Sequence, residues 1–164
     1  MSFIVEDGSV VANANAYIAV ADADAYFADR GVTAWTGSNT QKEQWIVQAT
    51  DYIDKKYGDR LLNDRLSETQ ALEFPRSVFD PIMPVVLLYA CAEYALRAIA
   101  GPLMPDPVAD ATGRTVVSSS DSVGPISTSR SYNAGGSVKL FRSYPAADML
   151  MRSLVSQSQG RVYR

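Results

Sequence analysis

The stretch from Val85 to Ala100 constrains the fold most, because it is apolar on almost every side. Its only charged residues are Glu93 and Arg97, which are spaced four apart and can pair along one edge of a helix. Pro84 suits the first turn of such a helix, and the Gly101-Pro102 pair is a typical stop signal. Because a helix that is apolar all round is a buried one, we expect residues 85–100 to form the central helix of a core and not a membrane span.

The composition of the chain limits the classes of function that it can have. A chain of 164 residues is long enough for one domain with its own core. Its single cysteine, Cys91, excludes an internal disulfide framework and lies in the apolar stretch, where a thiol is inert. The chain has no histidine, which is the commonest general base and metal ligand. We therefore expect no enzymatic activity, no cofactor and no metal site. The chain also begins without the pattern of a signal peptide.

Two elements are expected before residue 31. The Asp7-Gly8 pair lies between two short apolar runs, which predicts an N-terminal β-hairpin. Residues 22–30 are expected to form a short helix capped by Asp22. Asp24 follows two positions later, but carboxylates at this spacing diverge on a helix and predict no metal site.

The most regular helical pattern runs from Ser38 to Tyr57, with a possible capping box at residues 40–43. Its aromatic rings could stack on nucleic-acid bases, but rings at helical spacing are far more often part of a core. Residues 67–72 are expected to start another short helix. Arg76 then has three interpretations: it bonds carbonyls at a helix end, bonds an acid of a partner, or is an ordinary surface arginine.

The last third of the chain looks different from the rest. Residues 114–132 are rich in Val, Ser and Thr, and we expect an extended arm or loose hairpin with too little apolar surface for its own core. Residues 133–137 are read as a hinge. A short helix is predicted from Pro145 to about Val155, with an apolar face of Met149, Leu150, Leu154 and Val155.

The net charge of −3 conceals a strong asymmetry. Residues 1–110 hold eight Lys and Arg against sixteen Asp and Glu, whereas residues 111–164 hold seven against two. A basic segment following an acidic body indicates an acidic partner, which could be a protein, a nucleic acid or the body of a neighbouring copy. A solvated basic tail without a partner is the simpler alternative.

The expected fold is mainly α, a small helical bundle around one buried central helix. An N-terminal β-hairpin, an extended β-like arm and a short C-terminal helix accompany the bundle. The expected parts are a helical body with its hairpin (1–110), an arm and hinge (111–140), and a C-terminal helix with a basic tail (141–164).

The order and spacing of several segments resemble the small head–tail connector, or adaptor, proteins of tailed bacteriophages. The matching segments are AYIAVADADAYFADRG (16–31), Trp35, QATDYIDKKYG (48–58), QALEFPR (70–76), IMPVVLLYACAEYALRA (82–98) and DSVGPIST (121–128). Relatives of such proteins are often labelled DnaT-like single-stranded-DNA-binding proteins. No single segment is diagnostic of a chemistry.

The resemblance implies a subunit of a ring, with twelvefold symmetry, in the neck of a virion assembled in the host cytoplasm. Its partners would be other copies of itself, the portal protein and the next neck or tail-completion protein. DNA would pass through the channel without specific binding, and no membrane is involved. The alternative is a DnaT-like protein that binds single-stranded DNA as a replication accessory. The residues expected to contact the portal or a neighbour are Arg76, Val116, Val123, Ile126, Arg130, Tyr132, Arg142, Met149, Arg152, Leu154, Arg161, Tyr163 and Arg164.

Overall fold

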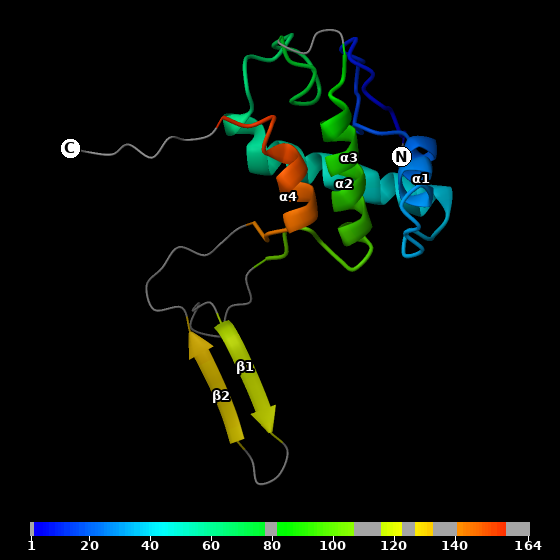
Figure 1. Ribbon diagram of the computed structural model, residues 1–164. Helices are drawn as coiled ribbons and strands as arrows, with labels where there is room; N and C mark the ends of the chain where they lie inside the picture. Colours follow the sequence, from blue (N-terminus) through cyan, green and yellow to red (C-terminus); the bar gives the residue numbers. More distant parts are fainter. Residues whose placement is uncertain (1, 78–81, 107–115, 123–126, 133–140, 157–164) are drawn as a thin grey trace, which may run out of the picture. The chain divides into compact units, whose positions relative to one another are not determined.

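The computed structural model describes residues 2–77, 82–106, 116–122, 127–132 and 141–156. Residues 116–122 and 127–132 are strands, of which the backbone alone is described. The described part is mainly helical, as expected (Figure 1). Its elements in chain order are α1 (Val20–Ala28), α2 (Asn39–Tyr57), the 3-10 helix η1 (Gly58–Arg60), α3 (Val85–Ala98), β1 (Val116–Ser122), β2 (Ser127–Tyr132) and α4 (Pro145–Met151).

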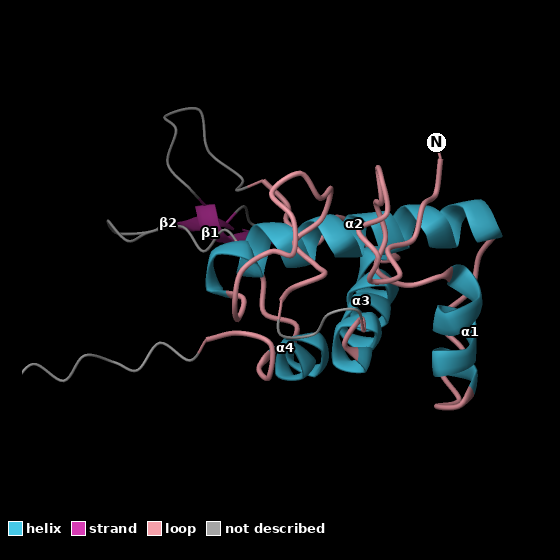
Figure 2. Cartoon of the chain, turned by 90° about the horizontal axis from the view of Figure 1, so that it is seen from above, coloured by secondary structure: helices cyan, strands magenta, loops and turns pink. Residues whose placement is uncertain are grey.

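Helix α3 is the centre of the bundle, because it contacts each of the other three α-helices. Seen from above, α2 runs across the bundle (Figure 2). The helix begins at Val85, as predicted, and Pro84 caps its start with an extended backbone. Glu93 and Arg97 form the predicted ion pair. The first turn of α3 is apolar but is not fully buried, since the side chain of Val85 is 53% exposed.

Local hydrogen bonds set the starts of α1 and α2. The capping box of α2 lies two residues earlier than predicted: the Ser38 hydroxyl accepts from the Gln41 amide, and the Gln41 side chain accepts from the Ser38 amide. Helix α1 starts at Val20, without a side-chain cap, so the predicted cap at Asp22 was wrong. Asp22 lies instead in the first turn, where a carboxylate favours the helix dipole.

The N-terminal hairpin is not formed. The Glu6 carboxylate accepts hydrogen bonds from the backbone amides of Gly8, Val10 and Val11, so residues 8–11 fold around this side chain instead of forming a second strand. Val5 forms only a single parallel bridge, with Ala16. The short helix expected at residues 67–72 is likewise a set of turns.

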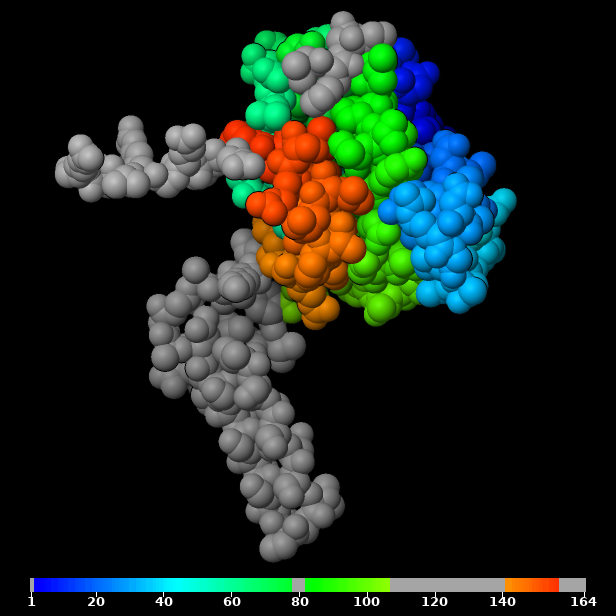
Figure 3. All heavy atoms as spheres, viewed as in Figure 1, coloured from blue at the N-terminus to red at the C-terminus, as the bar shows by residue number. Residues whose placement is uncertain are grey.

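Helix α4 belongs to the helical body and packs on α3 (Figure 3, orange to red against green). It ends at Met151, four residues before the predicted end, because Val155 is extended and pairs with Leu61. Its buried face contains Ala147 and Met151. The predicted apolar face was therefore wrong at Met149, which is 60% exposed.

Contacts divide the described chain into two compact units. The helical body contains the residues up to Leu103 and those from Ser143 onwards, and the second unit comprises residues 104–142. In the second unit, β1 and β2 pair antiparallel, with Ser120 opposite Ser129. The extended arm and the boundaries at 110 and 140 stay predictions. The Tyr144 hydroxyl donates to the Leu103 carbonyl at 3.0 Å. This hydrogen bond connects the two parts of the body that flank residues 104–142.

Candidate interaction surface

Most cations of the helical body already have an anionic partner. Six of them form ion pairs: Lys42 with Asp24, Lys55 with Asp51, Lys56 with Asp148, Arg65 and Arg76 with Glu73, and Arg97 with Glu93. A nucleic-acid phosphate would have to compete with these carboxylates. Because phosphate binding depends on Lys and Arg, the described body is poorly suited to holding a DNA backbone.

The aromatic rings of the body are packed inward. Every aromatic side chain described in the body is buried or half-buried. Trp35 lies between Phe27 and Trp45, at ring-centroid distances of 5.1 and 5.8 Å. The interpretation of these residues as core, rather than as a platform for bases, is confirmed for the part that the structure describes.

Arg76 is a structural residue of the body. Its side chain is 6% exposed, and one Nη donates to the Glu73 carboxylate at 2.6 Å. The same Nη donates to the carbonyl of Gly58, the C-terminal cap of α2, at 3.3 Å, and the other donates to the carbonyl of Asn63. The first of its three interpretations is therefore confirmed. The guanidinium is occupied inside its own chain, and its expected contact with the portal or a neighbour stays a prediction.

A cluster around Asp148 fixes α4 to the rest of the body. The Asp148 carboxylate accepts from Lys56 Nζ at 2.6 Å, from the Tyr57 hydroxyl at 3.0 Å and from the Tyr94 hydroxyl. It also accepts from the Tyr144 amide at 3.0 Å. Burial by itself would raise the pKa of Asp148, but the hydrogen bonds from Lys56 and Tyr94 outweigh it, so this pKa lies below its ordinary value.

The sequence analysis missed this cluster. Asp148 and Lys56 are 92 positions apart, and no local pattern connects them. The available signal was weak: Asp148 is the only acid of the predicted C-terminal helix, and it lies between the apolar residues Ala147 and Met149.

A second missed carboxylate is Asp54, on the inner side of α2. It accepts from the Tyr17 hydroxyl and from the Glu73 amide, the latter at 3.2 Å. Burial raises the pKa of Asp54 to about 6, although both hydrogen bonds act in the opposite direction. Asp54 thus links residues before α1 to the segment that leads to Arg76.

The raised pKa of Asp54 predicts a pH dependence. Between about pH 4 and pH 6 the folded chain binds a proton at Asp54 that the unfolded chain does not, so acidification stabilises the fold through this group. We expect the variant Asp54→Asn to lose this gain, which is on the order of 2 kcal/mol. Urea unfolding at pH 7 and pH 4.5 measures it. Equal pH dependence in the parent and the variant would contradict the assignment.

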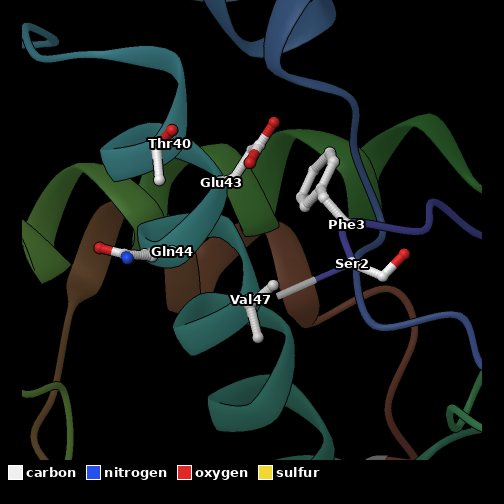
Figure 4. Close-up of a pocket in the computed structure, with 6 residues that line it drawn as sticks. All are labelled: Ser2, Phe3, Thr40, Glu43, Gln44 and Val47. Carbon is white, nitrogen blue, oxygen red and sulfur yellow. The ribbon is translucent and has the colours of Figure 1, made fainter.

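A small groove of about 100 Å³ lies between the N-terminal segment and the first half of α2 (Figure 4). It is lined by Ser2, Phe3, Thr40, Glu43, Gln44 and Val47. Its one charged residue, Glu43, is acidic, so the groove does not suit a phosphate. Within the described residues there is also no group of three side chains that could hold a metal ion. None of the described helices is long and apolar enough to cross a membrane.

The remaining predicted contact residues have different outcomes. Leu154 is 2% exposed and its carbonyl accepts from the Leu62 amide, and its expected contact with a partner stays a prediction. Met149 and Arg152 are exposed, and their role stays a prediction, as does that of the exposed Arg142. The others are not described: Val123, Ile126, Arg161, Tyr163 and Arg164 lie outside the described residues, and the side chains of Val116, Arg130 and Tyr132 are not described within their strands.

The comparison with protein families gives one match. The model of the family described as "Putative DnaT-like ssDNA binding protein" matches residues 1–164, the whole chain. The chain belongs to this family. The DnaT-like label attached to the sequence resemblance is thereby supported, whereas the resemblance to phage connectors stays a prediction. Comparisons with curated proteins and with solved structures found no match.

Proposed function

We propose that the protein binds single-stranded DNA through its basic C-terminal third, residues 111–164. The family description, which names single-stranded DNA, supports the ligand. The distribution of charge supports the location, since this third carries seven Lys and Arg against two acids. It also contains tyrosines at 132 and 163, outside the packed rings of the body, and rings interleaved with cations are what sequence-independent binding of single strands uses.

The ion pairs of the body are the observation on which the assignment of DNA binding to the C-terminal third rests. With six body cations engaged by carboxylates, a strand of DNA gains more from the basic segment than from α1–α3. The role of the body in this proposal is to present the basic segment. Helix α4 is fixed to the rest of the body by the Asp148 cluster.

The proposal predicts that binding of single-stranded DNA weakens as the salt concentration rises, and that the cations of the C-terminal third cause this dependence. A labelled oligo(dT) is titrated with the full-length protein at several salt concentrations, and binding is followed by fluorescence anisotropy. Neutralising Arg114, Arg130 and Lys139 to Gln should weaken binding and reduce the salt slope by about 2, since each lost phosphate contact on a single strand contributes roughly 0.7.

The matched control neutralises three cations of the body, Arg30, Lys55 and Arg60, to Gln. The control removes the same number of positive charges as the first variant. These side chains are exposed, so the fold should tolerate the change. The control should retain its salt slope. Absence of binding by the parent at low salt, or equal losses in the two variants, would contradict the proposal.

A second candidate is the structural adaptor of a virion neck. The observation that favours it is the opposition of an acidic, internally paired body and a basic segment. Such a pair of surfaces gives a head-to-tail contact that can close into a ring. In this proposal residues 114–132 lie on a neighbouring subunit, and the C-terminal tail reaches the portal.

Imaging separates the two candidates. The adaptor predicts rings of the purified protein, or its presence in the neck of phage particles, by electron microscopy. A monomer that binds oligonucleotides and is missing from particles would contradict the adaptor and support the DNA-binding proposal.

A further inference from the structure

Strands β1 and β2 form a two-stranded sheet, and no third strand joins them in the described part of the chain (Figure 1). In an antiparallel pair, every second amide and carbonyl of each strand points away from the partner strand. The sheet therefore has two outer edges, and each edge presents backbone donors and acceptors that suit a further strand.

The faces of this sheet contain few apolar residues. Because cross-strand partners lie on the same face, the register places six serines on one face, at positions 118, 120, 122, 127, 129 and 131. The opposite face contains the positions of Ser119, Asp121, Thr128 and Arg130. A two-stranded hairpin is at best marginally stable alone, and without an apolar face it gains little by packing on a core. Pairing at an outer edge is the remaining way to stabilise it.

The edges also lack the usual protection against another strand. Edge strands are commonly blocked by lysine, by proline or by a bulge. Neither β1 nor β2 contains Lys or Pro, and the one irregularity of their register lies at the end of the ladder, between Val116 and Ser118. The rest of the ladder is regular, so both strands offer a straight run of backbone to a partner.

The charges of the two strands indicate which edges join. Strand β1 contains one acid, Asp121, and no base, whereas β2 contains one base, Arg130, and no acid. Pairing β1 with β1 of another copy, or β2 with β2, would bring like charges together, which destabilises neighbouring strands. Pairing β2 with β1 of another copy brings opposite charges together instead. A second copy of this chain thus supplies a strand of complementary charge for each edge.

We propose that the outer edge of β2 in one copy pairs antiparallel with the outer edge of β1 in a second copy, so that the hairpins of successive copies form one continuous sheet. In such strand addition the main-chain hydrogen bonds provide most of the affinity. The contact is head-to-tail, because each copy uses its β2 edge towards one neighbour and its β1 edge towards the other, and contacts of this kind close into rings or continue as filaments. The inference does not depend on DNA binding. Where the adaptor role holds, this pairing is the contact that joins its copies.

Two charge variants of the full-length chain test the pairing. In Asp121→Arg both strands are basic, and in Arg130→Asp both are acidic, so each variant can pair with itself only by bringing like charges together. We expect each variant alone to self-associate roughly tenfold more weakly than the parent. An equimolar mixture of the two should associate about as tightly as the parent, since every contact between the two variants joins a basic edge to an acidic one. Analytical ultracentrifugation over a concentration series measures the association.

The mixture separates a contact between copies from damage within one hairpin. Each hairpin in the mixture still contains two like charges, so restored association has to come from pairing between copies. The matched control variants are Asp51→Arg and Lys55→Asp, which make the same changes of charge at an exposed ion pair of the body. Each of them alone, and their mixture, should associate as the parent does.

Three results would overturn the proposal: a parent that stays monomeric over the whole concentration series, strand variants that associate as the parent does, and a loss that mixing does not restore. Neither DNA nor phage particles are present in this experiment. Its failure is therefore distinguishable from failure of the DNA-binding proposal and from failure of the adaptor proposal.

Discussion

Replacing Arg76 with methionine is expected to lower the free energy of unfolding by about 3–5 kcal/mol, the loss typical of a buried ion pair that loses one partner. The variant leaves Glu73 without its close cation and leaves the carbonyls of Gly58 and Asn63 without their donor. These carbonyls belong to the end of α2 and to the segment after it. Urea unfolding followed by circular dichroism measures the loss.

Arg65→Met is the matched control for this variant. Arg65 faces the same Glu73, but at 3.9 Å and with a side chain that is 36% exposed. It should lose at most about 1 kcal/mol, as exposed pairs do. Similar losses in the two variants would show that Arg76 is not the residue that joins these segments.

Replacing Asp148 with alanine is expected to lower the free energy of unfolding by about 3 kcal/mol and to release α4 from the body. The variant leaves the ammonium of Lys56, which is 11% exposed, without its carboxylate, and it removes the acceptor for Tyr94. Asp51→Ala, which breaks the exposed pair with Lys55, should change the stability by about 0.5 kcal/mol or less. Urea unfolding of both variants makes the comparison, and equal effects would contradict it.

The pH dependence of Asp148 has the opposite sign to that of Asp54. Because the pKa of Asp148 is lower in the folded chain, its contribution is complete above about pH 4 and is lost as the pH falls further. Asp54 stabilises the fold as the pH falls from 6 towards 4. Together these two groups favour the folded chain most at mildly acidic pH, and the contribution of Asp148 to holding α4 is lost on stronger acidification.

The sequence predicted what depends on local pattern. The apolar run and its flanking proline placed the start of α3 at Val85, and the spacing of Glu93 and Arg97 predicted their ion pair. Helix α2 was predicted to within one residue at its start. Local hydrophobic periodicity and turn residues decide such features, so one stretch of sequence contains the information.

What the sequence did not predict depends on contacts between distant residues. The turn signal at Asp7-Gly8 was overridden because the preceding residue, Glu6, captured the backbone amides with its side chain. The early end of α4 follows from the backbone pairing of residues 154 and 155 with Leu61 and Leu62, which no local spacing indicates. Arg76 was open to three interpretations, and only the position of Gly58 beside it decided among them.

The bond from Tyr144 to the carbonyl of Leu103 has a consequence for how this chain tolerates change. A segment whose entry and exit are held together by the scaffold acts as a cassette, since its length and content can vary without altering the spacing that the scaffold requires. An engineer could therefore exchange residues 104–142 for an unrelated module at the same two positions while the helices around α3 stay unchanged.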